Sequence, residues 1–497
     1  MTTNLQTIPE QLLLEVFHFT CAKDLFQFRL SSKSFNQLIT KSEIANTLWT
    51  EKLKLDFSYD DEENEETEWF TCIKINEDPN EREGRVQGIS IFGFHLSEDP
   101  LFPSKSAFEA YKSFCKANLI LYKNIDPLPK LNASYMIRAA RIWYELASWC
   151  LDPDDELDPM EPYLDFRRRL LQSFYPGIMH CHGRFREVNQ SDISITMAAD
   201  CLFAFCDGQS RPTDAETAAV SLFGGFQVYN HVQLTMLINS IQTKSFMLQQ
   251  PKELILANDI INGLPSIVLS LQTGNVELRT SSNNSEESYE DRLVIASGQD
   301  AALTWFENHV RKLVRGEIEV IRGSKDDHPF DNDWTYISPF PTSKSSRASR
   351  CVTRGIEVIA SAIPAHEIDT VVYSIRIRML KEGEEGYLTP QQRGFETCQL
   401  HTRHWKLVNL DSNNEDLVNG EGVIGKFPIL FEGGYVNGSG ERNLGSFIYQ
   451  SCTGREMNNG TFEGHMSFTP GSIRQPTGEP FNVYVGQFEL SMSPSLL

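Results

Sequence analysis

The alternation of apolar and polar residues in the last third of the chain is the feature that most constrains its fold. Between Val371 and Met379 the odd positions are valine, tyrosine, isoleucine, isoleucine and methionine. Ser374, Arg376 and Arg378 stand at even positions of the same segment. Because successive side chains of a strand point to opposite faces, this period-2 pattern predicts a strand with one buried and one exposed face.

Two later segments repeat the alternation. Phenylalanine, glycine, methionine and phenylalanine occupy every second position of 462–468. In the last segment the apolar positions shift phase between Val485 and Phe488, which predicts a β-bulge near Gly486. Glycines punctuate the runs between, as is typical of short strands joined by turns. Residues 351–497 are therefore predicted to form a small antiparallel β-sandwich or barrel.

Composition divides the rest of the chain, so we predict a multidomain α+β protein. At about 150 residues per domain, 497 residues suggest about three domains. We expect the serine-rich tract 342–349 to be exposed. The predicted divisions are a short helical block (5–55), an acidic irregular region (56–133), a larger block that opens with helical periodicity (134–323), a polar linker (324–350) and the β-sandwich (351–497).

The net charge of −22 disfavours a nucleic-acid binder, because phosphate backbones and anionic lipid surfaces repel such a chain. Residues 217–243 carry no formal charge but hold too many polar groups for a membrane span, and the first residues lack the basic region of a secretory signal. Ten cysteines without a C-x-x-C pair indicate free thiols. We expect a soluble protein of the cytoplasm, the nucleus or both, with neither nucleic acid nor membrane as a partner.

The first block combines helix signals with more apolar side chains than so short a segment can bury. Pro9 suits the first turn of a helix, and Asp24 can cap a second helix. Between them leucine, valine and phenylalanine recur at i,i+4 spacing. Because about 45 residues make too small a core to be stable alone, we expect the block to complete its burial against a partner protein.

This block resembles an F-box in its Ile8–Pro9 start, its Asp24–Leu25 pair and its closing Leu48–Trp49. In that family a three-helix segment docks on a Skp-type adaptor of a cullin–RING ubiquitin ligase. An ordinary helical hairpin is the alternative interpretation. The resemblance implies that the apolar residues of the block bind the adaptor, namely Ile8, Pro9, Leu12, Leu13, Val16, Phe17, Leu25 and Phe28.

Five separated motifs of the last block resemble the ApaG domain, a fibronectin-III-like β-sandwich, over about residues 351–495. The motifs lie, in order, at 398–406, 420–428, 447–452, 460–464 and 480–483. The resemblance implies a fold and does not itself imply an activity.

Gly420, Gly422 and Gly425 match the letters of a dinucleotide-binding fingerprint. That fingerprint needs a helix directly after the glycines, whereas Phe427–Pro428 would break a helix at once. We therefore predict that the glycines serve a turn between strands. Binding or hydrolysis of a phosphorylated nucleotide by the ApaG-like domain is kept as the alternative function.

The middle block is similar to SUKH (Smi–Knr-like) domains, α/β modules that bind other proteins, at 206–209, 222–226 and 305–310. Its early part, 152–188, departs from that pattern. The three modules in this order resemble the F-box only protein 3-like family. Leu497 directly follows the sandwich, so the acidic tail of animal members is not expected here.

No catalytic, metal-binding or cofactor-binding residues stand out. His180 and His182 have no third metal ligand placed by the sequence, and no cysteine stands beside a base in a nucleophile motif. We therefore predict a non-catalytic substrate-recognition subunit of an SCF (Skp–cullin–F-box) ubiquitin ligase. Its partners would be the Skp-type adaptor, the cullin–RING ligase reached through it, and an unknown protein substrate.

Overall fold

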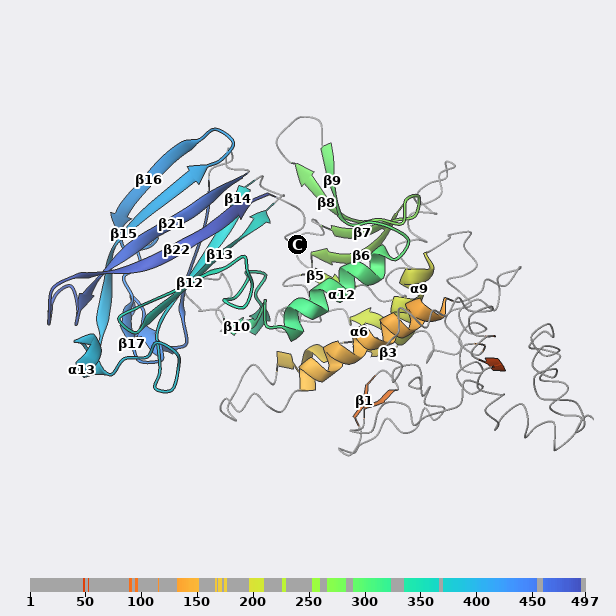
Figure 1. The fold of residues 1–497 in the computed structure, drawn as a ribbon, viewed down its shortest axis with the longest axis horizontal. Coiled ribbons are helices and arrows are strands. Elements are labelled where there is room, and N and C mark those ends of the chain that lie inside the picture. The colour runs from red at the N-terminus through yellow and green to blue at the C-terminus, as the bar shows by residue number, and fades with distance from the viewer. Residues whose placement is uncertain are drawn as a thin grey trace, which may run out of the picture.

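The computed structural model shows helices and a sheet in the middle of the chain and a two-sheet sandwich at its end (Figure 1). Leu48, Trp49 and Lys52 are buried, and the rest of the predicted helical block at 5–55 lies outside the described residues. The described residues are 48–49, 52, 89–91, 94–96, 115, 132–151, 166–167, 169–171, 174–176, 196–209, 226–228, 253–259, 266–282, 289–322, 335–365, 370–453 and 459–492.

Helices and an antiparallel sheet make up the described part of the middle region. The helices α6 (Ala133–Leu151), α9 (Met197–Phe205) and α12 (Ala301–Val314) contact one another. In Figure 1, α12 lies between α6 and the sheet, whose strands β8 and β9 it contacts. The sheet has the order β5 (Phe226–Val228), β6 (Glu253–Asp259), β7 (Ser266–Ser270), β8 (Val276–Ser282) and β9 (Tyr289–Ala296).

Short antiparallel pairs complete the described elements outside the sandwich. These pairs are β1 (Ile89–Ile91) with β2 (Phe94–Leu96), β3 (Phe174–Pro176) with β4 (Cys206–Gln209), and β10 (Val320–Arg322) with β11 (Thr335–Ile337).

Trp143 of α6 joins the three helices. Its ring centroid lies 4.6 Å from that of Phe306 in α12, and its Nε1 donates to the carbonyl of Leu202 in α9 at 2.8 Å. Ile137 and Leu146 are buried on the same helix, which confirms the helical periodicity predicted there. One apolar face of α6 therefore supplies the contact with both neighbouring helices.

A buried carboxylate adds an ionic contact between α6 and α12. Glu307 of α12 accepts hydrogen bonds from Arg138 at 2.5 Å and Arg141 at 3.0 Å, both on α6. Arg311, one turn further along α12, donates to the same carboxylate at 2.7 Å. Because a buried charge without partners would be costly, Glu307 holds the two helices in one relative position.

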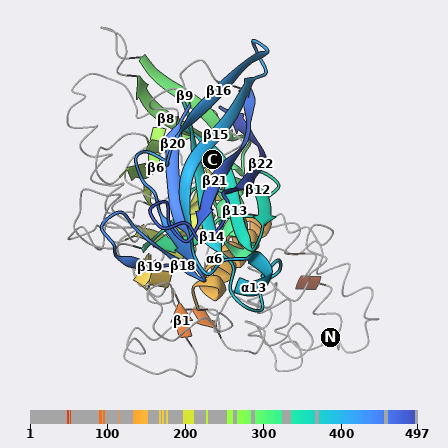
Figure 2. The same cartoon turned by 90° about the vertical axis from the view of Figure 1, so that its left-hand side faces the viewer.

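Two sheets form the sandwich (Figure 2). Helix α13 (Pro390–Arg393) is a single turn that Thr389 caps. The four-stranded sheet has the order β12 (Ser349–Thr353), β13 (Ile356–Ala365), β14 (Thr370–Met379) and β20 (Phe447–Cys452). The seven-stranded sheet has the order β19 (Arg442–Leu444), β18 (Gly434–Val436), β17 (Ile429–Phe431), β15 (Cys398–Asn409), β21 (Asn459–Pro470) and β22 (Phe481–Ser491), with β16 (Asn414–Glu421) beside β15.

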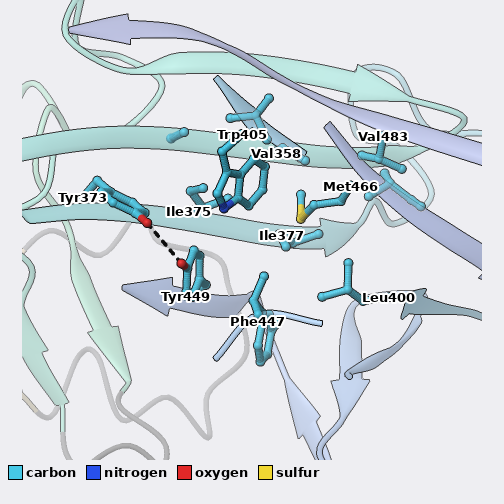
Figure 3. Close-up of a cluster of buried hydrophobic side chains, with 14 of the residues drawn as sticks. Val358, Tyr373, Ile375, Ile377, Leu400, Trp405, Phe447, Tyr449, Met466 and Val483 are labelled. Atoms are coloured by element: carbon cyan, nitrogen blue, oxygen red, sulfur yellow. Dashed lines mark hydrogen bonds between the residues drawn. The ribbon is translucent and has the colours of Figure 1, made fainter. Parts of the chain in front are cut away.

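Aromatic rings fill the space between the two sheets. The ring of Phe462 in β21 lies 4.9 Å from Tyr373, 5.3 Å from Trp405 and 4.9 Å from Phe488, measured between centroids. Figure 3 shows Tyr373 and Tyr449 joined through their hydroxyl groups, whose oxygens are 3.1 Å apart. The hydroxyl pair satisfies polar groups that would otherwise be costly to bury.

The alternation predicted for 371–379 and 462–468 is confirmed as β14 and β21. The bulge is confirmed as well. Phe462 pairs with Phe488 and Gly464 pairs with Val485, so β22 holds one extra residue opposite β21.

The exposure predicted for the even positions of β14 is wrong for Ser374 and Arg376, which are 1% and 4% exposed. The chain before the sandwich covers this face. Arg376 pairs with Glu319 and donates to Ser338 Oγ at 2.8 Å and to the Phe340 carbonyl at 3.2 Å. The Arg376 guanidinium can be buried here because a carboxylate balances its charge, and a hydroxyl and a carbonyl accept hydrogen bonds from it.

Within the segment predicted as a polar linker, the described residues 335–350 are packed against the rest of the chain. This segment contains β11, and its residues Ser338, Phe340 and Thr342 are buried. The Thr342 amide donates to the Glu317 carbonyl at 2.8 Å, and Ser361 Oγ of β13 donates to the Pro341 carbonyl at 2.9 Å. The exposure expected for Thr342 is wrong, whereas Ser343 and Ser346 are exposed.

Replacing Phe462 by alanine should destabilise the sandwich strongly. The change removes a fully buried ring that contacts aromatic side chains from three strands, so we expect a loss of about 3–5 kcal/mol in unfolding free energy. Urea unfolding of the full chain, with hydrogen exchange of β21 amides as the local reporter, measures it. Leu444→Ala is the control, because Leu444 is 88% exposed and should change stability by less than about 0.5 kcal/mol. Equal effects of the two changes would contradict the assignment of this core.

Candidate functional site

All eight residues predicted to bind the adaptor, from Ile8 to Phe28, lie outside the described residues. Their role stays a prediction. Within the described sandwich, two features carry side chains that could bind a ligand or a partner. They are the loop of Gly420, Gly422 and Gly425, and the outer face and open edge of the seven-stranded sheet.

The glycine loop is a tight turn between strands, as predicted. Lys426 donates its N–H to the Val423 carbonyl at 2.9 Å, and φ is +48° at Ile424 and +72° at Gly425. Positive φ at both central residues of a turn is the signature of type I′. Gly422 also has a positive φ, of +56°, and a Cβ there would lie 2.6 Å from the Lys426 carbonyl oxygen.

The polar groups of this loop are not arranged to hold a phosphate. Gly422 donates its N–H to the His401 carbonyl at 2.8 Å, and Val423 donates to the Lys426 carbonyl at 3.0 Å. Two carbonyl oxygens of the loop point toward the Arg403 guanidinium. Arg403 donates to Gly422 O at 2.7 Å and to Glu421 O at 3.2 Å. A phosphate-binding loop instead points free N–H groups at its ligand.

Gly420 makes room for Arg403. A Cβ at Gly420 would lie 3.0 Å from the guanidinium, so the arginine crosses the strand where no side chain stands. Gly422 and Gly425 are thus required because their φ angles are positive. Gly420 is required because the Arg403 guanidinium lies where its side chain would be.

A pair of stacked imidazoles lies on the outer face of the seven-stranded sheet. His404 of β15 and His465 of β21 are cross-strand partners with ring centroids 4.7 Å apart, and Tyr484 of β22 lies 6.2 Å from His465. His404 Nδ1 is 2.8 Å from Asn419 Oδ1 on β16, and its Nε2 is 3.1 Å from Thr402 Oγ1. Burial lowers the pKa of His465, and the neighbouring His404 lowers it further.

Sequence reasoning missed this pair. The alternation places both histidines at outward positions of their strands, and it does not reveal that these positions are opposite one another.

Three buried cysteines are poor nucleophiles. Burial raises the pKa of Cys150 to about 12 and raises the pKa of Cys201 and Cys398 well above the ordinary value for a thiol. These thiols are protonated at neutral pH, whereas attack requires the thiolate. Among the described residues, no three His, Cys, Asp or Glu side chains gather as metal ligands would. Of the helices that the structure describes, none has the length and apolar character needed to cross a membrane.

Replacing Ile424 by asparagine should stabilise the sandwich. A β-branched residue is strained at positive φ, and the resulting Asn–Gly pair is the preferred centre of a type I′ turn, so we expect a gain of about 1 kcal/mol. Gly422→Val is the opposite change and should cost roughly 1–3 kcal/mol. Thermal unfolding of both variants measures the effects. A Gly422→Val protein as stable as the original chain would contradict the turn geometry.

We expect the stacked imidazoles to make the sandwich less stable as the pH falls from neutral to acidic values. His465 has a lowered pKa in the folded state, so the unfolded chain takes up this proton first and unfolding is favoured as pH falls below about 6.5. We expect His465→Gln to lose less stability than the original chain between neutral pH and pH 5, measured by urea unfolding. Tyr484→Phe keeps the neighbouring ring and should leave the pH slope unchanged. Identical slopes for His465→Gln and the original chain would contradict this assignment.

Two known domains match the chain. The F-box domain matches residues 5–46, and the ApaG domain matches residues 366–470. The second match covers most of the described sandwich, including the glycine turn and the stacked histidines. The resemblances seen in the sequence are thereby confirmed for these two domains.

Solved structures align with less than a third of the chain, and their TM-scores are low. A crystal structure of the ApaA protein from Bordetella pertussis is 20% identical, aligns with 29% of this chain and 94% of its own, and has a TM-score of 0.19.

F-box proteins of plants and animals align with longer parts of the chain. F-box only protein 3 of Homo sapiens is 28% identical over 164 residues, which are 33% of this chain and 29% of that protein. F-box protein SKIP16 of Arabidopsis thaliana is 30% identical over an alignment of 328 positions, which covers 60% of this chain and 70% of that protein. With an F-box near its start and an ApaG domain in its last third, the chain belongs to the family of F-box protein SKIP16.

Proposed function

We propose that the chain is a substrate-recognition subunit of an SCF E3 ubiquitin ligase, which promotes the ubiquitination and degradation of the proteins it binds. The F-box match at residues 5–46 carries this proposal, because it stands in a chain homologous to an F-box protein over 60% of its length. The first block would bind a Skp-type adaptor and, through it, the cullin–RING ligase. We infer that this subunit acts in the cytoplasm, the nucleus or both.

In this proposal the subunit accelerates ubiquitin transfer by position alone. Holding a substrate lysine near the ligase raises its effective concentration, and other chains perform the chemistry. The contacts of Arg376 with Glu319, Ser338 and Phe340 support this role. They tie the sandwich to the end of the middle region, so a substrate bound to one of the two parts would keep a constant orientation relative to the other.

The middle region is proposed to be a SUKH-like, protein-binding module. The described helices and antiparallel sheet are compatible with a mixed α/β module, and the buried Glu307 network would keep its helices rigid. Rigid binding surfaces lose less conformational entropy when a partner docks.

Nucleotide binding or hydrolysis is the weaker candidate. The N–H groups of Gly422, Val423 and Lys426 are engaged within the turn and with β15, and the loop carbonyls face Arg403. No helix follows the turn, because β17 begins at Ile429. We therefore infer that the subunit is non-catalytic and needs no cofactor.

Replacing Leu12 and Phe17 together by aspartate should abolish adaptor binding. These residues belong to the apolar set that we propose to contact the adaptor, and burying an unpaired carboxylate costs more than the roughly 2–7 kcal/mol of an uncharged polar group. Co-purification of a Skp-type adaptor with the full chain measures the loss.

The matched control replaces Gln11 and Glu15 by lysine, because these two polar residues lie in the same segment but do not belong to the apolar set. This control should retain the adaptor. Hydrogen exchange of the sandwich must be equal in both variants, which shows that the rest of the chain is folded. Retention of the adaptor by the aspartate variant would refute the proposal.

A further inference from the structure

Strand β16 is an open edge of the seven-stranded sheet. It pairs with β15 from Thr402–Glu421 to Asn409–Asn414, and among the described residues no strand pairs with its other side. Seven of its eight residues are exposed, and Gly420 is half-buried. Figures 1 and 2 show β16 at the outside of the sandwich, away from the five-stranded sheet of the middle region.

The backbone groups of this edge alternate in direction. Gly422 donates to the His401 carbonyl at 2.8 Å, which makes these residues a hydrogen-bonded pair. In an antiparallel ladder such pairs alternate with pairs whose N–H and C=O point away from the partner strand. Following the register, the N–H and C=O of Glu415, Leu417 and Asn419 point to the open side.

Exposed apolar side chains lie along β16 and in the turns at its two ends. Leu417 is 67% exposed and Val418 is 40% exposed on β16, while Leu410 and Ile424 in the flanking turns are 52% and 62% exposed. Edge strands are commonly protected by lysine, proline or a bulge. Strand β16 contains neither lysine nor proline, and its register with β15 is regular throughout.

The charge of the edge is acidic. Glu415, Asp416 and Glu421 lie on β16, and Lys406 neutralises only the first of them, at 3.1 Å. Within the described ranges Asp416 and Glu421 make no ion pair. Two copies of this edge facing one another would bring like charges together, which disfavours self-pairing.

We propose that the open edge of β16 binds an extended, lysine- or arginine-bearing segment of a partner protein by strand addition. The main chain of that segment would pair with Glu415, Leu417 and Asn419. Side chains of an added strand alternate in direction, so its basic residues would lie on the face of the sheet that carries Asp416, and its apolar residues on the opposite face, over Leu417. The proposal rests on the proposed function in one respect, namely that this partner is the ubiquitination substrate.

A short fluorescent peptide that alternates lysine with valine is the probe, and its anisotropy is measured with the full chain. The matched control peptide carries an N-methyl group on every residue, which removes the N–H groups of both its edges and keeps its charge. We expect the first peptide to bind and the second to bind at least about tenfold more weakly. Equal binding of both peptides, or binding of neither, would overturn the proposal.

Variants of the chain locate the site. Leu417→Pro removes an N–H that points to the open side, which edge strands tolerate, and should weaken peptide binding by about tenfold. Asp416→Lys should weaken it similarly through charge repulsion with the lysines of the peptide. Leu444→Lys, at the 88% exposed Leu444 of another strand, should bind as the original chain does. Unchanged binding by the Asp416→Lys protein would overturn the assignment to β16, whether or not Leu417→Pro folds.

Adaptor co-purification separates this inference from the proposed function. The β16 variants should retain the adaptor, since the F-box match ends at residue 46. Loss of the peptide with the adaptor retained places the site at β16 and supports the inference. A chain that binds the peptide at β16 but no adaptor would refute the ligase role and leave strand addition supported.

Discussion

The aromatic layer between the two sheets is the contact on which the rest of the sandwich depends. Phe462 meets rings from β14, β15 and β22, so a single side chain fixes the separation of the sheets and the relative position of three strands. The outward positions of β15 and β21 follow from this inward packing. His404 and His465 point outward because Trp405 and Phe462 point inward on the same two strands, and the register of β15 with β21 places the two histidines opposite one another.

Strands and the bulge could be predicted from the sequence because alternation is a local property of the chain. The burial of Arg376 could not. A polar residue in a strand indicates that its side chain leaves the core, and it does not indicate whether another segment covers that side. Here the cover comes from Glu319, Ser338 and Phe340, 36 to 57 residues earlier in the chain. Such a contact depends on tertiary structure, and periodicity contains no information about it.

The glycine motif shows the same division between local and distant information. Phe427–Pro428 excludes a following helix on local grounds, and the turn was predictable for that reason. The positive φ of Ile424 could not be predicted, because isoleucine is disfavoured at positive φ. The register of β15 and β16, which the local sequence does not reveal, imposes this backbone conformation. Arg403 completes the turn by bonding two of its carbonyls, a contact that requires Gly420 to lack a side chain.

The two sheets of the sandwich differ in whether other segments of the described chain cover them. On the four-stranded sheet the chain itself covers the outer side of β14, and displacing that cover would leave the Arg376 guanidinium buried without its partners. On the seven-stranded sheet the described part of the chain leaves β16 exposed along its length. A partner that docks there need displace no protein contact of β16. Among the described residues, the face of β14 around Arg376 is therefore covered, whereas the edge of β16, on the side of the sandwich that faces away from the middle region, is open.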